Sequence, residues 1–134
     1  MPATGTPAST PVACATAPLD DYAGLWFDPD EPGWGLSIVQ DAQDRVFAAW
    51  FAYDADARPT WLVMPAATST RAAGFEGTLY RTRGSAFDAP YEASLFSVAP
   101  AGVLRVEFAP DGTARASFEV DGRTVVKTMR RQPL

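Results

Sequence analysis

The stretch VLRVEFAPDGTARASFEVDGRTVVKTM, residues 103–129, decides the fold. Apolar side chains alternate with charged or polar ones over residues 104–108 and again over residues 114–121. A period of two is typical of strands that bury one face. Pro110-Asp111-Gly112 and Asp121-Gly122 interrupt the alternation with residues that favour tight turns. The stretch therefore predicts three consecutive antiparallel strands joined by two hairpins.

The chain before this stretch has the same character. Residues 46–53 are rich in aromatic side chains that suit a half-buried pleat, and residues 41–44 and 54–58 have the composition of turns. Apolar residues nowhere recur with helical spacing for more than one turn. The two long links, residues 65–74 and 83–92, carry no helical pattern either. We predict strands over residues 22–27, 34–40, 45–53, 59–64, 75–82, 93–98, 103–109, 113–120 and 123–130.

This succession of short strands predicts an all-β protein, an antiparallel up-and-down meander of about eight strands. An open meander leaves strand edges unpaired, and closure into a small barrel removes them. An eight-stranded barrel encloses room for side chains or for one small ligand. We therefore predict a closed barrel, and a β-sandwich is the alternative.

The composition of the chain changes at about residue 20. Residues 1–19 are almost entirely Pro, Ala, Thr and Ser, which indicates an extended, disordered spacer. Residues 20–131 form one predicted β-barrel domain, long enough for its own core, and residues 132–134 form a tail. Cys14 is the single cysteine and lies in the spacer. We interpret it as a free thiol, with an interchain disulfide or a lipid attachment site as alternatives.

Charge and composition exclude several classes of function. The net charge is −5 and the isoelectric point is about 4.5, which excludes a nucleic-acid partner because phosphate binding requires a basic surface. The chain has no histidine and one cysteine, which excludes zinc or iron–sulfur sites built from these residues and the usual catalytic triad. We expect no cofactor. No apolar run approaches the roughly 18 residues of a membrane-spanning helix.

The acidic residues do not form a recognisable metal or catalytic motif. Asp28, Asp30 and Glu31 offer the oxygen ligands that calcium takes, but their spacing is not that of an EF-hand loop and two prolines restrict the backbone. We expect a solvated loop and no metal site. Glycoside hydrolysis would require paired carboxylates, such as Asp28 with Glu92 or Asp88, and nothing in the sequence brings such a pair together. Catalysis is therefore disfavoured.

The four tryptophans, at positions 26, 34, 50 and 61, all lie in the first half of the chain. Each can fill the core, or can present a flat face to a sugar ring or an apolar ligand. We predict that Trp34, between two glycines, and Trp61, after a turn and Pro59, form the accessible pair. The full candidate ligand-binding set is Trp34, Trp61, Trp50, Tyr53, Trp26, Asp28 and Gln40.

A long motif runs through GLWFDPDEPGWGLSIVQ, residues 24–40, and FAAWFAYDADARPTWLVMP, residues 47–65. Its positions are Gly24, Trp26, Pro29, Gly33, Gly35, Gln40, Trp50, Phe51, Tyr53, Asp54, Pro59, Trp61, Gly77, Leu79 and Tyr80. In these positions the chain resembles, over residues 22–131, a β module of many secreted proteobacterial proteins that has no agreed function. The resemblance implies a secreted or periplasmic protein, although residues 1–20 lack the charged start and apolar core of a secretory signal. The chain departs from this family in lacking the cysteine pair that relatives often carry after the last tryptophan.

A second motif is shorter. Gly24 and Trp26, at the start of the first strand, make the chain similar to the calycins, which include lipocalins and avidins. This similarity implies that Trp26 closes the base of the barrel. Biotin binding is not implied, because only Trp26 and the general layout match.

These observations favour a non-catalytic secreted binding module, with an aromatic-lined pocket or patch for a small apolar or sugar-like ligand. The alternative is a protein-interaction barrel such as a periplasmic protease inhibitor. In that case residues 1–19 would enter a protease cleft as an extended strand. A barrel enzyme is the third hypothesis.

Overall fold

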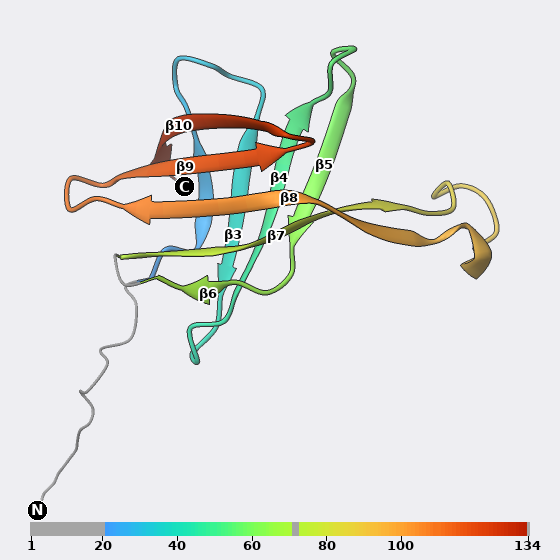
Figure 1. Ribbon diagram of the computed structural model, residues 1–134, viewed down its shortest axis with the longest axis horizontal. Coiled ribbons are helices and arrows are strands. Elements are labelled where there is room, and N and C mark those ends of the chain that lie inside the picture. The colour runs from blue at the N-terminus through green and yellow to red at the C-terminus, as the bar shows by residue number, and fades with distance from the viewer. Residues whose placement is uncertain (1–20, 71–72, 134) are drawn as a thin grey trace, which may run out of the picture.

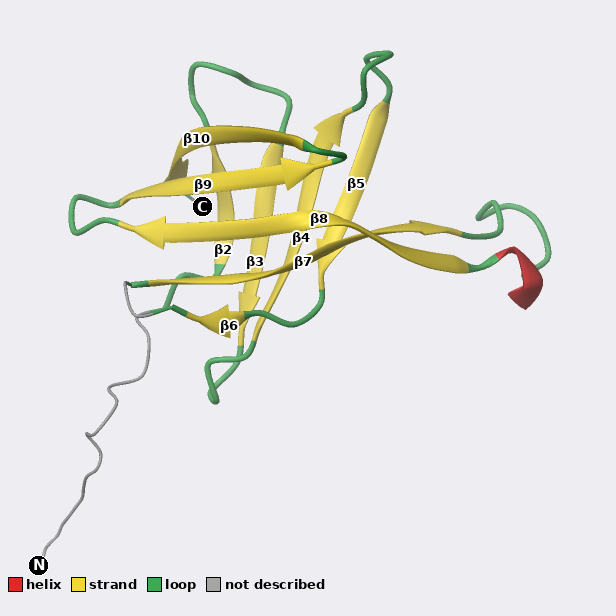
Figure 2. Cartoon of the chain, in the orientation of Figure 1, coloured by secondary structure: helices red, strands yellow, loops and turns green. Residues whose placement is uncertain are grey.

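The structure is a computed structural model that describes residues 21–70 and 73–133 (Figures 1 and 2). The predicted spacer, with Cys14, lies outside the described residues. The strands are β2 (Gly24–Phe27), β3 (Gly35–Gln40), β4 (Val46–Tyr53), β5 (Pro59–Met64), β6 (Thr68–Ser69), β7 (Gly74–Arg83), β8 (Ser97–Phe108), β9 (Thr113–Val120) and β10 (Arg123–Arg131). A single 3-10 turn over Ala93–Leu95 is the only helical element in the part of the chain that the structure describes.

The strands form one antiparallel sheet that closes on itself. Neighbours in sequence pair with each other from β2 to β5 and from β7 to β10. β10 returns to β2, with Arg131 opposite Trp26, and β5 meets β7, with Val63 opposite Tyr80. This is a closed eight-stranded barrel with β6 as one extra strand on the edge of β7. The predicted all-β barrel is confirmed.

One predicted boundary is wrong. Residues 93–98 and 103–109 do not form two strands, because Ser97–Phe108 is one continuous strand. Its partner β7 stays paired along this length, and the register shifts between Leu79 and Tyr80 so that Ala101 bulges out of the ladder. The bulge accommodates the Pro-Ala-Gly sequence of residues 100–102 that interrupts the alternating pattern. The predicted link 65–74 also contains a short strand, β6.

The ends of β7 and β8 that lie beyond this bulge leave the barrel. Residues 81–100, here called the arm, run out as a twisted hairpin that projects past β5 (Figure 1). The predicted link 83–92 and the 3-10 turn form its tip. Ser85 fastens the tip, because its Oγ accepts a hydrogen bond of 2.8 Å from the backbone N–H of Glu92.

The interior at one end of the barrel is filled by aromatic rings. Tyr22 stacks on Phe108 with ring centroids 3.7 Å apart, and Trp26 and Phe75 tilt against the same phenylalanine. The Trp26 indole N–H donates to the backbone oxygen of Tyr22 at 2.9 Å, and the guanidinium of Arg131 lies 5.0 Å from its ring centroid. These contacts leave Trp26 3% exposed. We call this end, where β7 begins and β8 ends, the base.

Candidate functional site

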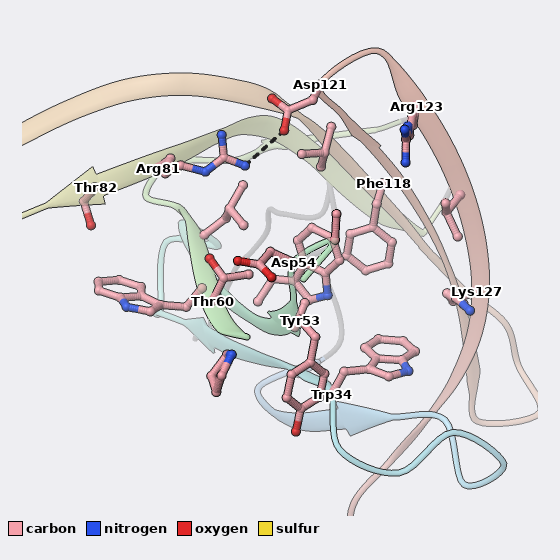
Figure 3. A pocket seen from close by; sticks show the side chains of 18 of the residues that line it. Trp34, Tyr53, Asp54, Thr60, Arg81, Thr82, Phe118, Asp121, Arg123 and Lys127 are labelled. Atoms are coloured by element: carbon pink, nitrogen blue, oxygen red, sulfur yellow. Dashed lines mark hydrogen bonds and ion pairs between the residues drawn. The ribbon is translucent and has the colours of Figure 1, made fainter. Parts of the chain in front are cut away.

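The opposite end of the barrel holds an open cavity of about 1100 Å³ (Figure 3). Its walls come from the loop before β3 and from β4, β5, β7, β9 and β10. The inward positions near the strand ends hold small residues, such as Ala52 and Thr60. These side chains are too short to fill the interior, so this end of the barrel stays open. We call this end the mouth.

Three aromatic rings form the inner lining of the mouth. Trp50 stacks on Phe118 with centroids 4.3 Å apart and an interplanar angle of 24°. The Trp34 ring meets Phe118 edge-on at 6.1 Å and 90°. Trp50 points inward because its register partners, Leu36 and Leu62, are both buried barrel positions. The cavity therefore ends on a floor of flat apolar faces.

The backbone around Trp34 explains how this ring reaches the mouth. Gly33 has a φ of +114°, a conformation that glycine adopts without strain, and it lies against the ring of Tyr53. Gly35 passes close to the backbone oxygen of Trp26, 3.3 Å from where a Cβ would stand. The chain thus turns sharply on both sides of Trp34, and Tyr53 and Trp34 lie together on one side of the opening (Figure 3).

A polar contact fixes Trp34 from outside. Its indole N–H donates to the Glu31 carboxylate at 3.2 Å, and Lys127 of β10 donates to the same oxygen, Glu31 Oε1, at 2.7 Å. These hydrogen bonds hold the pKa of Glu31 below its ordinary value, so the carboxylate is ionised at neutral pH. The Lys127 ammonium also lies 6.0 Å from the centroid of the Trp34 ring. The Glu31–Lys127 ion pair thus links the acidic loop to β10.

Basic side chains line the side of the mouth that faces the aromatic residues. Arg81 and Arg123 lie across the opening from Trp34 and Tyr53 in Figure 3. Arg81 pairs with Asp121 at 3.2 Å. Within residues 21–70 and 73–133, neither Arg83 nor Arg123 has a salt bridge or a side-chain hydrogen bond, although both line the cavity. Two guanidinium groups at the mouth are thus available to an anion.

The Trp50 indole N–H is a buried donor without a hydrogen-bond partner among the described residues. Most buried polar groups in proteins are paired, and an unpaired one costs roughly 1–3 kcal/mol. The Trp50 ring lines the cavity, whereas its Nε1 atom is buried.

Four of the seven residues predicted for the site line the cavity: Trp34, Trp50, Tyr53 and Trp61. They do not all lie inside it. Trp61 pairs with Phe51, an outward position of β4, and its side chain is 52% exposed. Register and exposure agree that Trp61 faces outward, so it contributes only to the rim. The predicted accessible pair therefore occupies two different surfaces.

The other three predicted residues do not line the cavity. Trp26 is buried at the base. Asp28 closes a turn of the acidic loop by accepting a hydrogen bond from the backbone N–H of Asp30 at 2.9 Å. Gln40 is at the far end of β3, where its side chain accepts from the Tyr22 N–H at 3.0 Å and donates to Asp44 at 3.1 Å. Strand direction carries Gln40 away from the cavity, whereas Asp28 lies in the same loop as Trp34 and its carboxylate is used within that loop.

Sequence reasoning missed Phe118 and the basic residues of the mouth. The alternating pattern predicts that Phe118 is an apolar residue on the buried face of a strand. It does not predict which aromatic ring Phe118 contacts. Arg81, Arg123 and Lys127 come together only because closure brings β10 and β7 around the same opening. Among the described residues, no group of three or more acidic, histidine or cysteine side chains is arranged to hold a metal ion.

No protein-family model matches the chain, and no curated protein or solved structure matches it. In the part of the chain that the structure describes, no helix has the length and apolar character needed to cross a membrane.

Proposed function

We propose that this protein is a non-catalytic, secreted or periplasmic binding module that takes a small molecule with a flat apolar or sugar-like body into the mouth of the barrel. The observation that supports it best is the open cavity of about 1100 Å³ that ends on the Trp50–Phe118 stack. Ligand sites are usually concave and apolar with a few polar groups, and eight-stranded barrels have room for one small ligand.

The charges at the mouth favour a ligand that carries a negative group. The whole chain has 11 basic and 16 acidic residues. Among the residues that line the cavity, four are basic and three are acidic. The basic ones are Arg81, Arg83, Arg123 and Lys127. A molecule whose ring lies on the aromatic floor can direct a carboxylate, sulfate or phosphate at these side chains.

Replacing Trp34 with alanine tests the aromatic lining. We expect the affinity for 2-naphthoate, a flat aromatic anion, to fall about tenfold or more, since the lost ring stacking and burial exceed about 1.4 kcal/mol. Isothermal titration calorimetry measures this directly. Phe47→Ala is the matched control, because Phe47 is an exposed aromatic residue on the outer face. Equal affinities for the wild type and Trp34→Ala would remove Trp34 from the site, and no binding of any flat probe would remove the proposed function.

Replacing Arg123 with glutamine tests the preference for an anion. We expect the affinity for 2-naphthoate to fall about threefold to tenfold, while the affinity for neutral 2-naphthalenemethanol stays the same. The wild-type affinity for the anion should also weaken with added salt. Arg115→Gln is the control, because Arg115 is exposed on the outer face of β9 opposite Glu107. Unchanged selectivity between the two probes would contradict the charge argument and leave the cavity as a neutral site.

The protease-inhibitor alternative depends on residues 1–19, which lie outside the described residues. No contact in the barrel favours it over ligand binding at the mouth.

A further inference from the structure

The outer face of β2, β3, β4 and β5 carries no charged side chain. The register places Val39 opposite Phe47, and Phe51 opposite Trp61, on this face. We call this surface the apolar wall. It consists of the outward residues Leu25, Ser37, Val39, Phe47, Ala49, Phe51, Tyr53, Pro59, Trp61 and Val63.

The side chains of the apolar wall are exposed to an unusual degree. Phe47 is 40% exposed, Phe51 47%, Tyr53 55% and Trp61 52%. Aromatic side chains of this size bury about 150–250 Å² when covered, so these four rings alone offer on the order of 400 Å². Monomeric proteins rarely expose a contiguous apolar patch larger than a few hundred Å². An apolar patch of this kind is typical of a surface that another molecule covers.

The opposite outer face shows that this is not a general property of the barrel. On β7, β8 and β9 the outward positions carry charges of both signs in register. Arg105 pairs with Glu76 at 3.1 Å, and Glu107 lies opposite Arg115. Such a charged face is typical of a surface exposed to solvent. On β2–β5, by contrast, the outward strand positions carry no charge, and the charged residues are confined to the connecting turns.

The arm adds apolar surface next to the wall. It leaves the barrel from β7, which is the strand that meets β5 through Tyr80 and Val63. Phe87 is fully exposed and Tyr91 is 73% exposed, and neither has a partner ring in the described part of the chain. The arm therefore extends the uncovered region beyond the β5 edge (Figure 1).

We propose that a second copy of this chain covers the apolar wall, in a two-fold symmetric dimer with the two walls packed face to face. A two-fold interface brings the same surface to itself, and a surface without charge has no like-charge repulsion to overcome. A standard interface needs about 800 Å² from each partner. The four rings, the aliphatic residues around them and the arm together approach that area. Sheets pack in this way about 10 Å apart.

The alternative occupants fit less well. An anionic lipid surface is disfavoured, because the chain has a net charge of −5 and the arm tip carries Asp88 and Glu92 without a basic residue between Gly84 and Phe96. The wall and the mouth share Tyr53, Pro59 and Trp61 at the rim, whereas the Trp50–Phe118 floor of the cavity lies inside the barrel. Phe51, at the centre of the wall, does not line the cavity, so a substitution there tests the dimer separately from the ligand site.

The test is the molar mass in solution, measured by sedimentation velocity from about 1 to 100 µM. The wild type is expected at twice the chain mass of 14.3 kDa. Phe51→Glu places a charge in the centre of the wall and is expected to raise the dissociation constant about 100-fold or more. Ser117→Glu is the matched control, because it adds the same charge to the opposite outer face, across from Arg105. This variant should remain a dimer.

A wild type that stays at 14.3 kDa at 100 µM would overturn the proposal, as would equal dissociation of Phe51→Glu and Ser117→Glu. Circular dichroism confirms that each variant is folded, and Phe47→Glu replaces Phe51→Glu if the latter does not fold. A monomer that co-sediments with phosphatidylglycerol vesicles would assign the wall to a lipid surface and would also overturn the dimer.

Discussion

Trp26→Ala is expected to lower the free energy of unfolding by about 3–5 kcal/mol, the range for removing a large buried aromatic side chain. Trp26 is 3% exposed, packs against Phe108 and donates its indole N–H to the Tyr22 backbone. Its removal leaves a cavity at the base and removes the hydrogen bond to the Tyr22 carbonyl oxygen. For a domain of this length, the melting temperature should fall by about 10 °C or more. Thermal and urea unfolding followed by circular dichroism measure the change.

Trp61→Ala provides the matched comparison. It removes the same side chain from a position that is 52% exposed, so the expected loss of stability is below about 1 kcal/mol. The comparison is made at a protein concentration low enough for the monomer to dominate, because the dimer would add its own stability. Equal losses for Trp26→Ala and Trp61→Ala would show that the base of the barrel does not depend on Trp26.

Gly102→Ala is expected to lower the free energy of unfolding by about 3 kcal/mol or more. A Cβ at this residue would overlap the backbone oxygen of Glu119 and lie 2.8 Å from its carbonyl carbon. Gly102 pairs with Leu79 on one side and Val120 on the other, so neither neighbouring strand can move away without breaking a ladder. Chemical denaturation measures the loss, and the arm should show faster amide exchange because its root is disturbed.

Gly84→Ala is the control for this substitution. No atom lies within 4 Å of a Cβ placed at Gly84, and the residue has no left-handed backbone conformation. Its stability should stay within about 0.5 kcal/mol of the wild type. A wild-type stability for Gly102→Ala would mean that β8 and β9 do not approach each other as closely as the structure shows.

The fold was predictable wherever one face of a strand is buried. The alternation over residues 104–108 and 114–121 gave the second half of β8 and all of β9, because buried and exposed side chains must alternate on a barrel wall. The first half of β8 was not predictable as part of the same strand. Residues of the arm bury neither face, and the bulge at Ala101 breaks the pattern. The Pro-Ala-Gly sequence of residues 100–102 has the composition of a turn, although the backbone of β8 stays extended through it.

The site was predictable only in part for the same reason. The sequence identifies tryptophans, but inward or outward direction depends on register, which separated Trp34 at the mouth from Trp61 on the apolar wall. Position along the strand was equally decisive, since it carried Gln40 to the opposite end of β3. Arg123 joined the site through strand closure, which no local pattern encodes.

The pairing of β10 with β2 has a consequence for how the molecule is made. Arg131 lies opposite Trp26, and the backbone N–H of Gln132 donates to Leu25 at 2.7 Å, so the last residues of the domain complete its first strand. During synthesis the N-terminus of the chain emerges first. One edge of β2 therefore stays unpaired until about a hundred more residues have been added. Such long-range pairing makes folding slow. The barrel therefore cannot close before β10 is made, and any sheet that forms earlier has an unpaired edge, which favours aggregation.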